Sequence, residues 1–192
     1  MEGWWAASYI VLWLLVVVLC FVVVALARQI GTLHLRLGPR GALEMDDEGP
    51  PLQEAPPPVD VVALDDQPVA VGGPGHAQLL LFVSPGCHLC EAVLPSLGAV
   101  SEAGDMMPLV VTDADKHETR RAYGDKRLRA PVIPSQKLAQ AYRVPGTPYA
   151  VILDDLGVVR AKGAVNNLEQ MEGLVDTARR RIAESALERQ AS

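Results

Sequence analysis

Hydrophobic and polar residues are segregated into three blocks along the chain. In the first block, residues 3–27 carry no charged side chain, and a helix needs roughly 20 apolar residues to cross a bilayer. Trp4 and Trp5 at one end of the apolar run and Arg28 at the other are typical of the flanks of a membrane span. The pattern therefore predicts a transmembrane anchor over residues 1–27.

A cleaved signal peptide is the alternative interpretation of this block, because residues 25–27 (Ala-Leu-Ala) have the small-x-small form of a processing site. However, the region before the apolar run contains Glu2 and no Lys or Arg, and the run is long for a signal core. We therefore expect an uncleaved anchor in a lipid bilayer. Cys20 lies inside the run and is expected to be a small packing residue.

The second block, residues 28–58, is polar and rich in proline. It carries a cluster of acidic residues at 44–48, followed by proline runs at 50–51 and 56–58. Such a composition cannot bury enough apolar surface to order itself, so it predicts a tether between the anchor and a domain. A short interfacial helix over residues 31–37 is the alternative for its beginning.

The third block, residues 59–192, has the periodicities of a folded domain. An opening hairpin is expected at residues 61–64 and 69–71. Buried strands and a terminal β-hairpin are predicted at 77–83, 109–111, 149–153 and 158–162. Helices are predicted at 87–103, 117–123, 135–142 and from Asn167 onward. This order predicts an α/β domain with a mixed central sheet and helices on both faces.

Composition excludes two classes of protein. The formal net charge is -6 and no segment is strongly basic, so we expect no nucleic-acid partner. The chain has only three cysteines, which excludes a small secreted scaffold held together by many disulfides.

Two cysteines, Cys87 and Cys90, stand where the strand predicted at 77–83 stops and the next helix starts. Unpaired N–H groups and the positive end of the helix dipole favour a thiolate at the first cysteine of such a junction. The thiolate can attack a disulfide, and the second cysteine, one turn later, can resolve the mixed disulfide. A Cys-x-x-Cys pair in a βαβ pattern therefore predicts catalytic thiol–disulfide exchange at Cys87 and Cys90.

Half of a zinc site and an inert pair are the alternatives for these cysteines. A zinc site needs further ligands, but the chain has no second cysteine pair, and His76, His88 and His117 do not stand at ligand spacing. We therefore expect no metal and no cofactor beyond the redox-active disulfide. His88, inside the pair, either tunes the thiolate of Cys87 through its charge or is a solvated side chain.

A second group of candidate site residues precedes the strand predicted at 149–153. A cis bond between Thr147 and Pro148 would expose backbone groups that can pair with an extended substrate segment. An ordinary trans-proline loop is the alternative.

Together, the cysteine pair at a strand-to-helix junction, Pro95 after it and Thr147-Pro148 before a hairpin resemble the thioredoxin fold. The resemblance covers about residues 59–185 and implies that Pro148 is a cis-proline facing the cysteines. With the membrane anchor, the chain resembles the membrane-tethered thiol–disulfide oxidoreductases similar to TlpA and ResA.

Less generic segments resemble the methylamine dehydrogenase accessory family called MauD. They are the juxtamembrane residues 27–43, Ser84-Pro85-x-Cys87-x-x-Cys90, Tyr149-Ala150-Val151, and residues 157–163 with Asn166. The resemblance implies that the protein forms or rearranges disulfides of the small subunit of methylamine dehydrogenase. It also implies electron exchange with a membrane thiol–disulfide partner.

Three features depart from the pattern of these families. Pro85-Gly86 stands where an aromatic residue often precedes the cysteine pair. Leu81, six residues before Cys87, stands where many thioredoxins carry a buried acid, so proton transfer involving Cys90 would use water or another group. His88-Leu89 replaces a more usual dipeptide that contains proline. The missing acid and the unusual dipeptide leave a non-catalytic chaperone platform as an alternative. A further alternative keeps the chemistry and changes the client, to apocytochrome c or another secreted protein.

The side of the membrane is predicted differently by two observations. Arg28, Arg36 and Arg40 follow the span, and Lys and Arg near a span favour the cytoplasmic side. The family resemblance implies the oxidising compartment outside the cytoplasm, where disulfides persist. We expect a bacterial inner-membrane protein with its domain on the periplasmic side.

Overall fold

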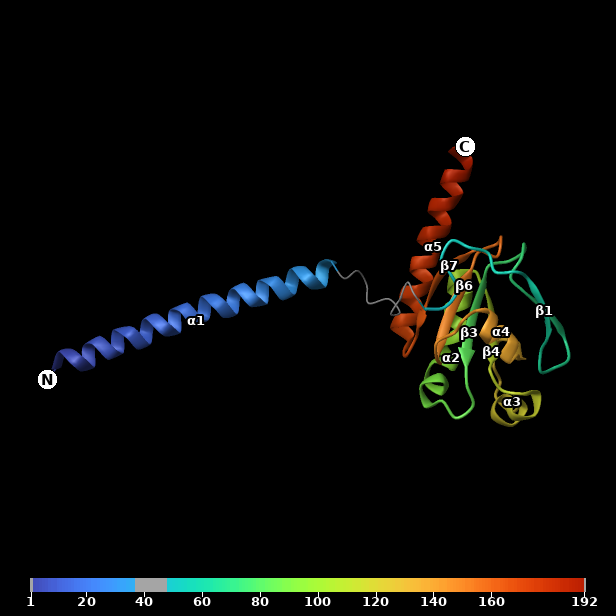
Figure 1. The fold of residues 1–192 in the computed structure, drawn as a ribbon, viewed down its shortest axis with the longest axis horizontal. Coiled ribbons are helices and arrows are strands. Elements are labelled where there is room, and N and C mark those ends of the chain that lie inside the picture. Colours follow the sequence, from blue (N-terminus) through green and yellow to red (C-terminus); the bar gives the residue numbers. More distant parts are fainter. Residues whose placement is uncertain (1, 37–47, 192) are drawn as a thin grey trace. The chain divides into compact units, whose positions relative to one another are not determined.

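The computed structural model describes residues 2–36 and 48–191. By its internal contacts the chain divides into two units, Met1–Pro39 and Arg40–Ser192. The first is built on a helix and the second is an α/β domain (Figure 1).

The N-terminal unit contains helix α1 (Glu2–Arg36). Its segment Gly3–Val23 is 21 residues long and has a mean hydropathy of 2.8, and none of its side chains that the structure describes is buried. By length and composition it can cross a membrane, as the apolar run predicts. The helix also continues past residue 27 into the block that was expected to begin the tether.

The domain is organised around a five-stranded mixed sheet. Its strands are β3 (Gln78–Val83), β4 (Met107–Thr112), β5 (Val132–Pro134), β6 (Tyr149–Leu153) and β7 (Val159–Ala164). They lie in the order β5-β4-β3-β6-β7. β3 pairs in parallel with β4 and antiparallel with β6, so it is the central strand, and all six of its residues are buried. This burial explains its unbroken apolar sequence.

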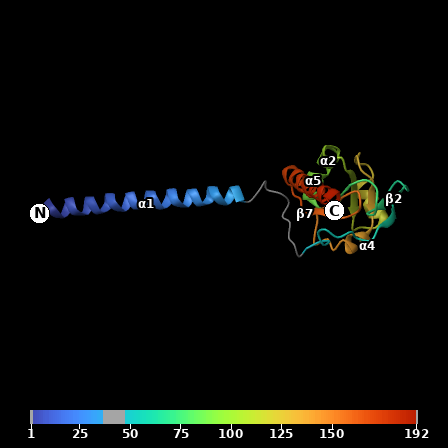
Figure 2. The ribbon, with the colours of Figure 1, turned by 90° about the horizontal axis from the view of Figure 1, so that it is seen from above.

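Helices cover both faces of the sheet, as predicted. They are α2 (His88–Gly104), α3 (Lys116–Tyr123), α4 (Gln136–Ala141) and α5 (Leu168–Ala191). α2 and α5 pack against the face formed by Leu79, Leu81 and Val83 of β3. α4 packs against the opposite face, which Leu80 and Phe82 share. Figure 2 shows α2 and α5 together on one side of the domain and α4 on the other.

Strand β5 is an element that the hydrophobic pattern did not predict. It has three residues, runs parallel to β4 at the edge of the sheet and ends in Pro134. A run this short between prolines carries no readable periodicity, and proline is tolerated at a sheet edge. The predicted opening hairpin is present as β1 (Val59–Val62) and β2 (Pro68–Val71), which form a separate two-stranded sheet.

The expected tether over residues 28–58 is not uniform. Residues 37–47 lie outside the described residues, whereas residues 48–54, which we call the strap, lie along the edge strand β7. The N–H of Gln53 donates to the carbonyl of Val159 at 2.9 Å, and the N–H of Val159 donates to the carbonyl of Glu54 at 2.9 Å. The strap is thus ordered by backbone hydrogen bonds to β7. It covers the edge of β7, whose backbone groups would otherwise be exposed.

Candidate active site

The end of β3 and the start of α2 position the two cysteines. β3 stops at Val83, and Gly86 turns the chain with φ +77°, a left-handed conformation that glycine adopts without steric cost. Cys87 is the N-cap of α2, with φ -77° and ψ 104°, and its Sγ accepts a hydrogen bond from the N–H of Cys90 at 3.2 Å. The first sulfur therefore lies at the positive end of the helix, where a thiolate is stabilised.

The two cysteines form a disulfide but differ in their exposure to solvent. The Cα atoms of Cys87 and Cys90 are 5.3 Å apart, and χ3 is 80°. Cys87 is partly exposed, whereas Cys90 is 0% exposed and packs in the core between the sheet and α2. A molecule in solution can therefore approach the Sγ of Cys87 and not that of Cys90.

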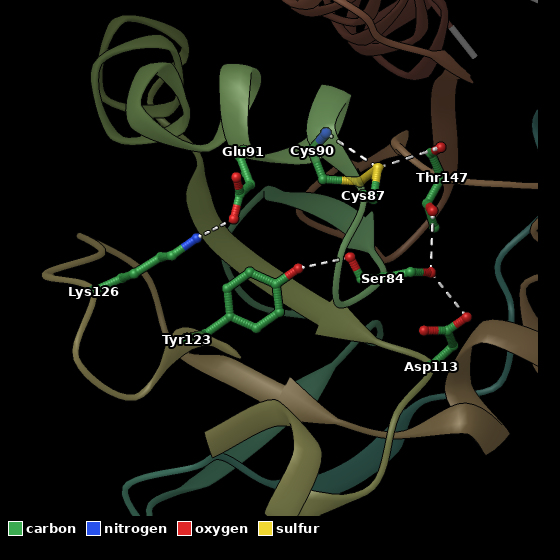
Figure 3. The surroundings of a disulfide bond; sticks show 8 residues. All are labelled: Ser84, Cys87, Cys90, Glu91, Asp113, Tyr123, Lys126 and Thr147. Carbon is green, nitrogen blue, oxygen red and sulfur yellow. Dashed lines mark hydrogen bonds and ion pairs between the residues drawn. A yellow bond between two sulfur atoms is a disulfide. The ribbon is translucent and has the colours of Figure 1, made fainter. Parts of the chain in front are cut away.

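The loop before β6 brings Thr147 and Pro148 against this disulfide. The Thr147–Pro148 peptide bond is cis, the first of the two alternatives. The Sγ of Cys87 lies 3.8 Å from the carbonyl oxygen of Thr147, across 60 residues of sequence (Figure 3). The structure thus brings together four of the five site residues that the sequence singled out, namely Cys87, Cys90, Thr147 and Pro148.

The fifth candidate, His88, is exposed at the first position of α2. The hydrogen bond and the charge of Lys126 are the main causes that lower the pKa of the Glu91 carboxyl, and His88 adds a smaller electrostatic contribution. Lys126 and Glu91 form an exposed ion pair at 2.8 Å. The tuning role of His88 stays a prediction.

Ser84 and its neighbours are site residues that sequence reasoning missed. The hydroxyl of Ser84 donates to Asp113 at 2.9 Å and accepts from the hydroxyl of Thr147 at 3.1 Å. Its carbonyl accepts from the hydroxyl of Tyr123 at 2.9 Å (Figure 3). The same carbonyl accepts from the N–H of Cys87 at 3.2 Å. Two signals for Ser84 were present in the sequence, its place directly after the buried strand and its position at the start of the Ser84-Pro85-x-Cys87-x-x-Cys90 segment, and neither revealed its contacts.

Tyr123 enters the site from the end of α3 as a neutral donor. Its side chain is buried, and burial raises its pKa to about 12, with a further contribution from the negative charges of Glu91 and Asp113. The ammonium of Lys126 lies 5.2 Å from the centroid of its ring, a favourable cation–π distance. Tyr123 therefore keeps its proton and its bond to Ser84 at physiological pH.

Leu81 of β3 is the residue that stands in place of the acid expected six residues before Cys87. It is 0% exposed and belongs to the same core cluster as Cys90. An aliphatic side chain neither accepts nor donates a proton, so this position of β3 cannot assist ionisation of the buried thiol.

A groove of about 290 Å³ opens beside Thr147. It is formed by the ends of β3 and β4, by α4 and by the loop 143–147, and Ser84, Asp113 and Arg143 contribute polar groups to its lining. Thr147 lines the groove, and its carbonyl oxygen lies 3.8 Å from the Sγ of Cys87, so one residue separates the groove from the disulfide. It offers room for a segment of polypeptide next to a cysteine that reacts with Cys87.

Solved structures of thioredoxin-fold proteins resemble the domain. The thioredoxin domain of a thiol-disulfide oxidoreductase from Bacteroides vulgatus has a TM-score of 0.55 and 16% identity, covering 66% of this chain and 97% of that one. The exposed lipoprotein thioredoxin of Streptococcus pneumoniae has a TM-score of 0.55 and 20% identity, covering 64% and 98%. At these identities the likeness shows the fold. That fold and the Cys87–Cys90 disulfide at the start of α2 define the class, a thioredoxin-fold thiol–disulfide oxidoreductase.

The sequence narrows the class to a family. The chain is similar to the methylamine utilization protein MauD of Paracoccus denitrificans, with 32% identity over 183 residues, 93% of this chain and 91% of the relative. MauD of Methylobacillus flagellatus is 34% identical over 182 residues, 93% of this chain and 88% of the relative. No protein-family model matches the chain. The chain belongs to the MauD family, as the juxtamembrane and active-site motifs predicted.

Proposed function

We propose that this protein forms or rearranges disulfides in the small subunit of methylamine dehydrogenase through the Cys87–Cys90 pair. The contrast in exposure between the two sulfurs carries the chemical part of the proposal, because it makes Cys87 the sulfur that clients reach. The client is suggested by the family, whose members in other organisms are named methylamine utilization proteins. The proposal assigns no cofactor other than the redox-active disulfide.

Disulfide formation follows from attack of a client thiolate on the Sγ of Cys87. The Cys87–Cys90 bond breaks, a mixed disulfide forms with Cys87, and Cys90 leaves as a thiolate that takes a proton from water. A second client thiolate then attacks the client sulfur of the mixed disulfide and releases Cys87. The client loses two electrons and gains a disulfide, and the protein gains a dithiol.

The protein returns to its disulfide by passing the two electrons to a membrane thiol–disulfide partner, whose own disulfide is reduced. Rearrangement needs no net electron transfer. In that case the Cys87 thiolate attacks a client disulfide and is later displaced by another client thiolate. The N-cap position supports both routes because it stabilises Cys87 as thiolate and as leaving group.

The loop at Thr147 and the adjoining groove are proposed to hold the client segment. A client cysteine bonded to Cys87 lies next to the Thr147 carbonyl, and an extended segment can pair with backbone groups there. Residues next to the client cysteine in sequence then enter the groove between α4 and the ends of β3 and β4.

Mixed-disulfide trapping in the native host tests the proposed client. A Cys90→Ala variant cannot resolve the mixed disulfide, so it is expected to accumulate adducts that acid quenching, alkylation and mass spectrometry identify as the methylamine dehydrogenase small subunit. The matched Cys87→Ser, Cys90→Ala variant keeps Cys20 and is expected to capture none of it. Capture of apocytochrome c or other secreted proteins without the small subunit would reject the client and favour a general reductase.

The proposal places the domain on the periplasmic side of the inner membrane. The arginines at positions 28, 36 and 40 count against this side, whereas the proposed oxidation of a client requires it. Alkaline phosphatase fused after Ser192 is active outside the cytoplasm and is expected to be active here. The assignment would be overturned if this fusion were inactive and a fusion to a reporter that works only in the cytoplasm were active.

A further inference from the structure

Ser84 connects three loops that meet at the disulfide. Its hydroxyl bonds to Asp113 after β4 and to Thr147 before β6, and its carbonyl bonds to the N–H of Cys87. Figure 3 shows the chain of contacts from Asp113 through Ser84 to Thr147, and from Thr147 to the sulfur of Cys87.

The direction of the two hydroxyl bonds is set by the chemistry of their partners. An ionised carboxylate is an acceptor only, so the single proton of the Ser84 hydroxyl goes to Asp113 at 2.9 Å. Ser84 is then the acceptor for Thr147 at 3.1 Å, which orients the Thr147 hydroxyl. A bond to a charged acceptor is stronger than a neutral one, so Asp113 fixes the rotamer of Ser84.

Thr147 connects these hydrogen bonds of Ser84 to the reacting sulfur of Cys87. The side chain of Thr147 is held by Ser84, while its carbonyl lies 3.8 Å from the Sγ of Cys87. We propose that Ser84 is a positioning residue for thiol–disulfide exchange, holding the Thr147 carbonyl beside Cys87 so that a polypeptide client can dock there. This inference rests on the proposed exchange activity and adds to it the residue that sets the docking geometry.

A small dithiol needs access to the sulfur alone, whereas a polypeptide also needs the docking loop. The positioning role therefore predicts that loss of the Ser84 hydroxyl lowers the rate with a polypeptide more than the rate with a small dithiol. A purely structural role would instead lower stability and change both rates by the same factor. The ratio of the two rates separates these possibilities.

The experiment compares the two rates for the full-length chain in nanodiscs. Reduced, unfolded ribonuclease A is the polypeptide probe and dithiothreitol the small dithiol, and acid quenching with alkylation follows reduction of Cys87–Cys90. For Ser84→Ala the ratio of polypeptide to dithiol rate constants is expected to fall about 5- to 10-fold, the effect of roughly one hydrogen bond. Ser84→Thr keeps the hydroxyl and is expected to recover the ratio.

Two further variants complete the test. Thr147→Val removes the hydroxyl that donates to Ser84. If the two hydroxyls act through the same bond, the double variant with Ser84→Ala should lower the ratio by less than the two single fold-changes multiplied together. Ser185→Ala on α5, whose hydroxyl bonds to the Ile182 carbonyl, is the matched serine control and should leave both rates unchanged.

An unchanged ratio in Ser84→Ala, with both reactions still measurable, would overturn the positioning role and leave the exchange activity intact. The positioning role would also be overturned if Ser84→Thr lowered the ratio as far as Ser84→Ala. A wild-type protein that reacted with neither probe would instead overturn the proposed function itself.

Discussion

The guanidinium of Arg160 and the carboxylate of Asp154 form an ion pair at 2.7 Å in the interior of the domain, where the two residues are 6% and 1% exposed. Asp154 also accepts from the N–H groups of Leu156 and Val158, which closes the turn between β6 and β7. A second nitrogen of Arg160 donates to the side chain of Gln53 at 2.6 Å. One buried cation thus joins the β6–β7 turn to the strap.

Arg160→Met is expected to lower the free energy of unfolding by about 3–5 kcal/mol, because it leaves the Asp154 carboxylate buried without its partner. Urea unfolding measures this change. The strap should also loosen, which increases cleavage by endoproteinase Glu-C after Glu48 or Glu54. Arg127→Met, at an exposed arginine, is the control and should change stability by less than about 0.5 kcal/mol. An equal effect of both substitutions would refute the structural role of the pair.

Removing the hydroxyl group is expected to change the free energy of unfolding in opposite directions at two buried tyrosines. The hydroxyl of Tyr142 is buried and has no hydrogen-bond partner among the described residues, so Tyr142→Phe should raise the free energy of unfolding by about 1 kcal/mol. The hydroxyl of Tyr123 bonds to the Ser84 carbonyl, so Tyr123→Phe should lower it by about 1 kcal/mol. Changes of the same sign in the two variants would contradict the difference in hydrogen bonding between Tyr142 and Tyr123.

Stability is expected to fall between pH 10 and pH 12. Burial raises the pKa of Tyr123 and of Tyr142 to about 12, above the ordinary value of 10.0. In this range the unfolded chain has lost phenolic protons that the folded chain keeps, so rising pH favours unfolding, and below pH 10 these groups add no pH dependence. Unfolding by urea at several pH values, with tyrosinate absorbance as a second readout, measures the slope. Tyr142→Phe should make it shallower, and an unchanged slope would argue against burial of the phenol.

The fold and the cysteine pair could be predicted because their signals are local. The unbroken apolar run of β3 and the helical pattern after it place Cys87 and Cys90 at a junction, and that junction alone favours a thiolate. The terminal hairpin was predicted for the same reason, since Asp154 and Gly157 mark its turn.

The order of the strap and the contacts of Ser84 could not be predicted, because the partners are distant in sequence. Ser84 is 29 residues from Asp113 and 63 from Thr147, and a serine after a strand does not reveal either contact. The strap has the polar, proline-rich composition of a tether, and its order depends on hydrogen bonds from Arg160 and Lys162 of β7 more than 100 residues away. The composition of a segment indicates how much apolar surface it can bury by itself. It does not indicate which hydrogen bonds a distant segment can make to it.

Thiol reactivity should differ between the two cysteines of the reduced protein. In a Cys20→Ala background, iodoacetamide is expected to alkylate Cys87 at least about 10-fold faster than Cys90, because Cys87 is accessible and its thiolate is stabilised by the helix. Timed alkylation with peptide mass spectrometry measures both rates. Equal rates would contradict the assignment of Cys87 as the attacking sulfur.

Equilibration of the full-length Cys20→Ala protein with glutathione buffers of graded potential tests the central claim, that Cys87 and Cys90 form a working redox pair. Alkylation and intact mass report the number of thiols at each potential. We predict a reversible two-electron transition in which both thiols appear together, and loss of client exchange in Cys87→Ser. A pair with no reversible couple, or a Cys87→Ser variant that exchanged disulfides at the full rate, would contradict the account and favour a binding platform without turnover.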